Sequence, residues 1–181
     1  MGELMARFLT PIGAALSIVL LACTTAGDDD RAVRLEDLPL ERLIVQDRDS
    51  GARSAVNAFA EFEEELPFEP VYPSELPEGF QLDSAIAYAV PGNFDPFGVR
   101  LALRWVDDGG SKLDIEQGRR EYGKGGEPIA LGDDVVGYLV SGQESVMTWR
   151  ACDLGFWLLA DSTLRSEDVV SIARLTLACG H

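Results

Sequence analysis

Length, composition and charge exclude several classes of protein. The chain has 181 residues, with 15 Lys and Arg against 31 Asp and Glu, and its formal net charge is −16. This balance disfavours nucleic-acid binding, because phosphates need Lys and Arg to neutralise them, and it disfavours lying flat on anionic lipid. We expect a solvated acidic surface, and a salt-adapted host would produce the same composition. The length suits one domain plus a tether.

The first residues have the pattern of an export signal. An apolar stretch runs from residue 8 to residue 21 and ends in Leu20-Leu21-Ala22-Cys23. A short start, an apolar core and a small residue before the cleavage site are typical of secretory signals. The last four residues resemble the lipobox of bacterial lipoproteins. That resemblance implies that Cys23 carries the lipid, becomes the new N-terminus and attaches the protein to a membrane.

Two alternatives stay open for this segment, namely ordinary signal cleavage and a retained helix. As a helix, the apolar stretch would rise about 21 Å, against a hydrocarbon core of about 30 Å, so it is short for a membrane span. We therefore expect a signal peptide over 1–22, a lipidated N-terminus and tether over 23–50, and an extracytoplasmic domain over 51–181. The choice between inner and outer membrane stays open.

The expected elements follow in chain order. Helical periodicity predicts a helix from about 52 to 65, and four prolines between 67 and 77 predict an extended course after it. Apolar alternation then predicts strands near 80–90, 99–105, 113–115, 129–131, 135–140, 146–151 and 156–160. A closing helix is expected from about 167 to 178. The sequence thus predicts an α+β fold: a curved antiparallel sheet of about six or seven strands, with an N-terminal and a C-terminal helix packed on one face.

The same periodicities predict which side chains form the apolar core. Each of the expected residues lies on the apolar side of its strand or helix: Phe80, Leu82, Val99, Leu101, Leu103, Trp105, Trp149, Phe156, Leu158, Ile172 and Leu177.

Two cysteines remain once Cys23 is assigned to the lipid. Cys152 and Cys179 would lie in an oxidising compartment, which favours one disulfide, and two buried free thiols are the alternative. The strand after Cys152 runs away for about 20 Å and the closing helix returns about 18 Å. Cys179 should therefore arrive beside the turn that contains Cys152.

The segment Tyr72-Pro73-Ser74-Glu75-Leu76-Pro77-Glu78-Gly79-Phe80, together with Gly155-Phe156-Trp157-Leu158, resembles a known family. This family is an extracytoplasmic domain of bacterial lipoproteins and of the outer ends of some anti-sigma factors. The resemblance covers roughly residues 52–178 and implies a proline-rich entry to a curved sheet, distantly like the half-barrel carriers of lipoproteins. It implies no established activity. The cysteine pair departs from the family, and no sigma-factor-binding domain is expected before the anchor.

Few residues could carry enzyme chemistry. The single histidine is His181, the final residue, so catalysis or zinc binding that depends on a positioned imidazole is disfavoured. Asp107-Asp108 and Asp133-Asp134 suit hairpin turns better than calcium sites, and Gly123-Lys124-Gly125-Gly126 lacks the spacing of a phosphate loop. We expect no metal, no cofactor and no enzymatic activity. A pair of carboxylates brought together by the fold stays open.

The loop over 92–98 places Phe94 and Phe97 between glycines and a proline. We expect the two rings to fold down as local packing, and the alternative is a lid over an apolar groove or a contact site for a partner. The leading hypothesis is a non-enzymatic interaction or sensory module that binds another envelope protein. The alternatives are a carrier of an amphiphile in the concave face of the sheet and a small enzyme. An apolar cavity would favour the carrier, and a filled core with an exposed aromatic patch would favour the interaction module.

Overall fold

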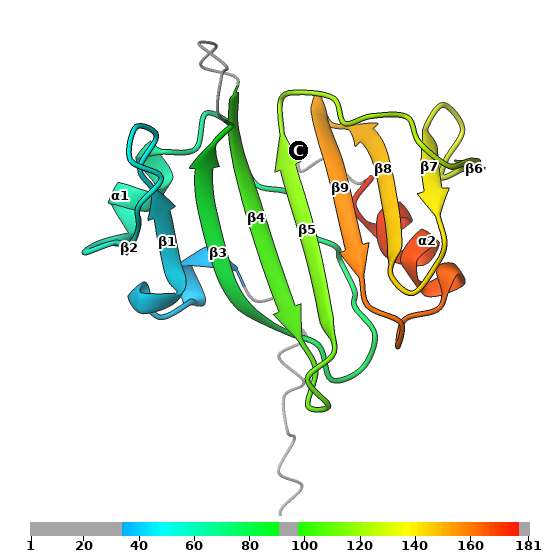
Figure 1. Ribbon diagram of the computed structural model, residues 1–181, viewed down its shortest axis with the longest axis horizontal. Coiled ribbons are helices and arrows are strands. Elements are labelled where there is room, and N and C mark those ends of the chain that lie inside the picture. The colour runs from blue at the N-terminus through cyan, green and yellow to red at the C-terminus, as the bar shows by residue number, and fades with distance from the viewer. Residues whose placement is uncertain (1–33, 91–97, 178–181) are drawn as a thin grey trace, which may run out of the picture. The chain divides into compact units, whose positions relative to one another are not determined.

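The computed structural model describes residues 34–90 and 98–177, and within these ranges the chain forms one nine-stranded sheet with two α-helices and two short 3-10 helices (Figure 1). The 3-10 helices are η1 (Leu35–Asp37) and η2 (Leu40–Arg42), and the α-helices are α1 (Phe59–Glu64) and α2 (Ser166–Leu175). The strands are β1 (Leu43–Gln46), β2 (Arg53–Ala55), β3 (Gln81–Ala89), β4 (Val99–Val106), β5 (Lys112–Gly118), β6 (Glu127–Ala130), β7 (Val136–Val140), β8 (Ser145–Ala151) and β9 (Leu154–Ala160).

The sheet is open and mixed, with the strand order β2-β1-β3-β4-β5-β9-β8-β7-β6. Neighbouring strands are antiparallel except β1 and β3, which are parallel. The predicted α+β class is confirmed. The expected strand number and the wholly antiparallel arrangement are wrong, because β1 and β2 come from residues for which no strand was expected.

The segment before α1 differs from the expected helix over 52–65. Asp47 Oδ1 accepts hydrogen bonds from the backbone and the hydroxyl of Ser50, both at 2.7 Å. These bonds close a turn that pairs β2 with β1. Only residues 59–64 are helical. The residues before this turn are also packed more closely than expected, since Leu43 is completely buried.

One face of the sheet, the inner face, forms the core. The buried side chains that lie opposite one another across six strands, in the order β1, β3, β4, β5, β9 and β8, are Leu43, Ala85, Leu103, Ile115, Leu158 and Met147. Eight of the expected core residues are buried, and Phe80, Val99 and Leu177 are half-buried. The inner face is therefore the side that strand alternation predicts.

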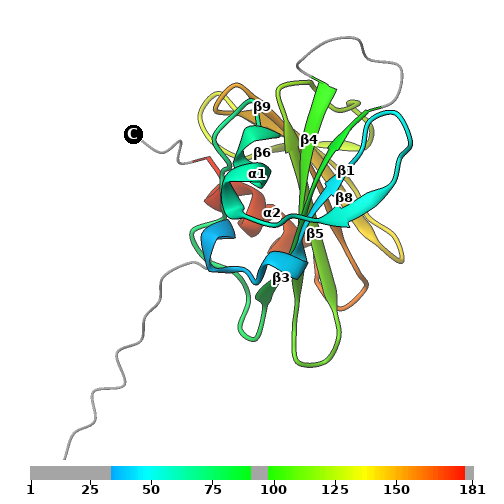
Figure 2. The same ribbon diagram turned by 90° about the vertical axis from the view of Figure 1, so that its left-hand side faces the viewer.

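Two helices and an extended segment cover the inner face. Both helices lie on the same side of the sheet (Figure 2). However, α1 contacts β1 while α2 contacts β8 and β9, so they cover opposite ends instead of forming one layer. Between them runs the proline-rich segment, whose Val71 exchanges two hydrogen bonds with the fully buried side chain of Gln117, at 2.8 and 2.9 Å. A buried amide satisfied in this way fixes the segment over β5.

A bulge in β3 changes which side chains face outward. Its register with β4 shifts between Leu82 and Ser84. Simple alternation places Leu82, Ile86 and Tyr88 on one face, but the shift directs Ile86 and Tyr88 to the outer face. One inserted residue reverses the side of every following residue, because the side-chain period of a strand is two.

Candidate functional site

Most of the residues predicted to carry the lipid, the disulfide or a binding contact lie outside the described ranges. These are the lipid-carrying Cys23, the loop residues Phe94 and Phe97, and the disulfide candidate Cys179. Only Cys152 of the expected site residues is described. The candidate sites that can be described lie on the faces of the sheet and among the segments that cover it.

Cys152 lies in the two-residue turn between β8 and β9. Cys152 and Asp153 both have positive φ angles, 54° and 59°, which suits the twist of a tight hairpin. The Cys152 Sγ lies 3.9 Å from the carbonyl oxygen of Leu177. The nearby Trp149 Nε1 donates to Thr176 Oγ1 at 3.1 Å and holds the C-terminal end of α2 against β8. The disulfide stays a prediction. The Cys152 turn lies beside Leu177, two residues before Cys179, as a bond between the two cysteines requires.

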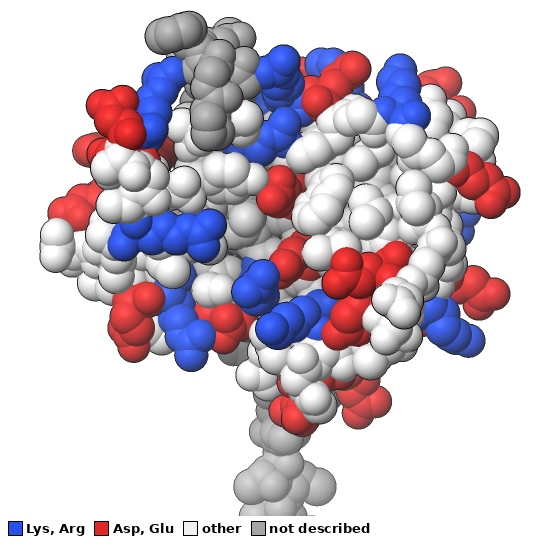
Figure 3. All heavy atoms as spheres, viewed as in Figure 1, with Lys and Arg blue, Asp and Glu red and all other residues white. Residues whose placement is uncertain are grey.

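The outer face of β7, β8 and β9 carries apolar side chains that are half-buried or exposed, and the chain at Gly123 covers it at Thr148, whose hydroxyl donates to the Gly123 carbonyl at 2.9 Å. Across the three strands, Tyr138, Thr148 and Trp157 lie side by side in one row. Val140, Val146 and Leu159 form the next row on the same face. In β7, Val136 and Val140 are 48% and 47% exposed. We call this set the outer apolar surface: Val136, Tyr138, Val140, Val146, Trp157 and Leu159. Figure 3 shows a broad uncharged area over these strands, with charged side chains around it.

The other half of the outer face carries a row of apolar side chains, Ile44, Ile86 and Ala102, together with paired charges. Arg104 in β4 makes two hydrogen bonds of 2.7 Å to the carboxylate of Asp114 in β5. Paired charges of this kind stay solvated, and they separate the uncharged half of the outer face from the opposite edge of the sheet.

A cluster of one arginine, two tyrosines and one glutamate lies between these halves. The Arg100 guanidinium carbon lies 3.8 Å from the centre of the Tyr122 ring, and Tyr122 Oη donates to Glu116 Oε2 at 3.4 Å. Burial raises the pKa of Tyr122, and burial followed by the charge of Glu116 raises the pKa of Tyr88. Both phenols therefore stay protonated near neutral pH and are unsuited to act as bases.

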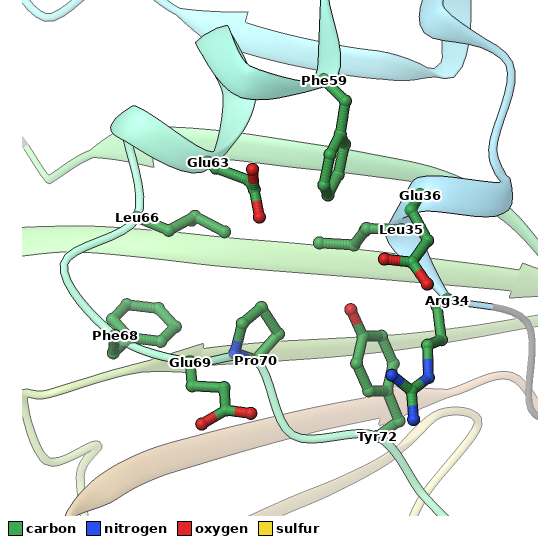
Figure 4. A pocket seen from close by; sticks show the side chains of 10 residues that line it. All are labelled: Arg34, Leu35, Glu36, Phe59, Glu63, Leu66, Phe68, Glu69, Pro70 and Tyr72. Atoms are coloured by element: carbon green, nitrogen blue, oxygen red, sulfur yellow. The ribbon is translucent and has the colours of Figure 1, made fainter.

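A pocket of about 340 Å³ lies between η1, α1 and the proline-rich segment (Figure 4). We call it the aromatic pocket, and it is lined by Arg34, Leu35, Glu36, Phe59, Glu63, Leu66, Phe68, Glu69, Pro70 and Tyr72. Burial raises the pKa of Tyr72 to about 12. Its walls come from three separate segments, so no local motif marks it in the sequence.

No protein-family model matches the chain, and no curated protein is significantly similar to it. The resemblance at the proline-rich segment therefore stays a proposal.

Metal sites and membrane-spanning helices can both be looked for among the described residues. Among residues 34–90 and 98–177, no group of three or more His, Cys, Asp or Glu side chains is placed to hold a metal ion. None of the helices in this part of the chain combines the length and the apolar character that crossing a membrane requires.

Sequence reasoning missed the outer apolar surface, although the chain carries a signal for it. Residues 156–160 read Phe-Trp-Leu-Leu-Ala, an unbroken apolar run. A strand with one face in water alternates apolar and polar residues, so an unbroken run places apolar side chains on both faces. Here Phe156 and Leu158 enter the core, while Trp157 and Leu159 point to the outer face.

Proposed function

We propose that this protein is an extracytoplasmic lipoprotein, attached to a membrane through Cys23, whose domain binds another envelope protein without catalysing a reaction. The outer apolar surface is the observation that carries the proposal. Its valines are half exposed in β7, and Trp157 and Tyr138 add aromatic area beside them. Aromatic residues are enriched at the centres of protein interfaces, and contiguous apolar patches on soluble domains mark binding sites.

The filled core favours protein binding over the carrier alternative. A carrier needs an apolar cavity against the sheet. Within the described ranges, the inner face is packed against α1, α2 and the proline-rich segment. The outer apolar surface is partly exposed and is not enclosed by other elements, so it suits a folded partner better than an enclosed amphiphile.

Lipidation has a direct test. Mass spectrometry of the native protein should find an N-terminal peptide that begins at a diacylglyceryl Cys23, with residues 1–22 absent. A Cys23→Ala variant should leave the detergent phase in a phase-partition assay, because a chain without the lipid loses its attachment. Recovery of an intact N-terminus, or of the variant in the detergent phase, would refute the assignment.

The outer apolar surface has its own test in cells that make the full-length protein. A photo-crosslinking amino acid at Val140 should give a discrete product with one envelope protein. The same amino acid at Leu40, which is 40% exposed in η2, serves as the matched control and should give none. Val136→Asp should abolish the Val140 product, because a charge buried within an apolar interface costs its desolvation.

The fold should survive these changes, since surface substitutions rarely alter stability by more than about 0.5 kcal/mol. Thermal unfolding of Val136→Asp should therefore match that of the unaltered protein. Products at Leu40 equal to those at Val140, or products with lipid alone, would overturn the proposed interface.

A further inference from the structure

The aromatic pocket lies on the helix side of the sheet and takes no part in the outer apolar surface. Phe59 projects into it from α1, and Phe68 and Tyr72 project from the proline-rich segment. Figure 4 shows the three rings and the Leu66 side chain arranged around one space, with the carboxylate of Glu63 pointing into it. The walls therefore combine three rings and aliphatic side chains with four charged residues, Arg34, Glu36, Glu63 and Glu69.

The charge around the pocket is mainly negative. Glu63 and Glu69 are exposed. Among the described residues, no ion pair or hydrogen bond involves either carboxylate. Arg34 is the one basic residue among those that line the pocket, and it lies beside Tyr72 and Glu36. The side of the pocket formed by α1 and residue 69 thus carries negative charge that its own neighbours leave uncompensated.

These features select one class of ligand. A cation is attracted to the face of an aromatic ring, and the attraction grows as the site loses water. The carboxylates of Glu63 and Glu69 add to this attraction and repel anions. A neutral apolar ligand would gain nothing from them. The volume of about 340 Å³ falls within the range of small-molecule sites.

We propose that the aromatic pocket binds a compact organic cation of the alkylammonium class, such as a quaternary ammonium group. The alkyl groups contact Phe59, Phe68 and Leu66, and the positive charge lies between the rings and Glu63. This site is independent of the proposed protein interface, so either can fail without the other.

Choline tests the proposal, with its neutral carbon analogue 3,3-dimethylbutan-1-ol as the control ligand. The full-length protein in a non-ionic detergent is titrated with each and followed by NMR of the pocket side chains. Choline should bind at least tenfold more tightly than the neutral analogue, and sodium chloride should weaken it. Equal binding of the two ligands, or no shift with choline at tens of millimolar, would overturn the proposal.

Matched variants locate the site. Glu63→Gln should weaken choline at least threefold, whereas Glu64→Gln, the next residue of α1 and absent from the pocket wall, should leave affinity unchanged. Phe68→Leu keeps an apolar side chain but removes a ring, and should also weaken choline. Equal effects of the two glutamate variants would refute a local site.

Free cations and choline phospholipids share this headgroup chemistry, and a further titration separates them. A lipid on Cys23 would itself enter bicelles, so the readout is the NMR shift of the pocket side chains. Phosphatidylcholine bicelles, and not phosphatidylglycerol bicelles, should shift these side chains in a Glu63-dependent manner if the headgroup is the natural source. Glu63-dependent binding of choline alone assigns the site to a free cation. Shifts with bicelles that are equal in the unaltered protein and in Glu63→Gln, with no binding of choline, would contradict both sources.

Discussion

Replacing Trp105 by alanine should destabilise the domain by about 3–5 kcal/mol, the usual cost of removing a large buried aromatic side chain. Trp105 is 4% exposed and lies between Leu82 of β3 and Leu113 of β5 on the inner face. No neighbour can fill the space without moving the backbone of the sheet. Urea unfolding monitored by far-ultraviolet circular dichroism gives the change in the free energy of unfolding.

Val106→Ala is the matched control for this prediction. Val106 is the next residue of β4 and is half-buried on the outer face. Its truncation should cost about 1 kcal/mol or less, because little buried volume is lost. Similar losses for the two variants would mean that the two faces of β4 are exchanged.

Replacing Cys152 by serine should lower the free energy of unfolding by about 3–4 kcal/mol, because a bond to Cys179 would restrict the unfolded chain. The Cys152 turn is adjacent to the last described residues after α2, at 3.9 Å from the Leu177 oxygen. Without the bond, the C-terminal end of α2 keeps the Trp149–Thr176 hydrogen bond but loses its covalent attachment to the β8–β9 turn.

Reduction supplies the control for the cysteine variant. The unaltered protein in reductant should unfold at the same urea concentration as Cys152→Ser, and reductant should not affect the variant. Thiol titration of the denatured, unreduced mature protein should find no reactive thiol. Two reactive thiols would exclude the bond.

Apolar alternation predicted the inner and outer faces of the central strands correctly, because the neighbouring strands bury the residues directly opposite. Leu101, Leu103 and Trp105 alternate along β4, and all three are buried. Each faces a buried residue of β5 directly across the sheet. Where both neighbouring strands share a pattern, the local sequence contains enough information to assign the faces.

The N-terminal elements show where local patterns fail. The helical periodicity places Val56, Phe59, Ala60 and Phe62 near one face; Val56 and Phe62 are buried and Phe59 is half-buried, but Ala60 is exposed. The chain around Val56 is nevertheless not helical, because β2 gains backbone hydrogen bonds from β1 through the Asp47–Ser50 turn. Pairing within the β1–β2 hairpin outweighs a weak helical preference, and a six-residue helix has little stability of its own.

Both candidate sites depend on contacts between distant residues. The outer apolar surface forms only when β7, β8 and β9 pair side by side. The aromatic pocket joins η1, α1 and the segment around Pro70. A single sequence gives the residue types that line such a pocket, but it does not show that the fold brings them together.

The parallel contact of β1 with β3 has a consequence for how the sheet avoids self-association. Strand edges with unpaired backbone groups can recruit further chains and seed aggregation. Here β1 shields the nine-residue β3 from one side, while the outermost β2 has three residues, all exposed. At the other end, β6 contains Pro128, which has no N–H to donate. Loss of residues 43–55 by proteolysis would uncover one edge of β3, so the N-terminal hairpin protects β3 from pairing with a strand of another copy.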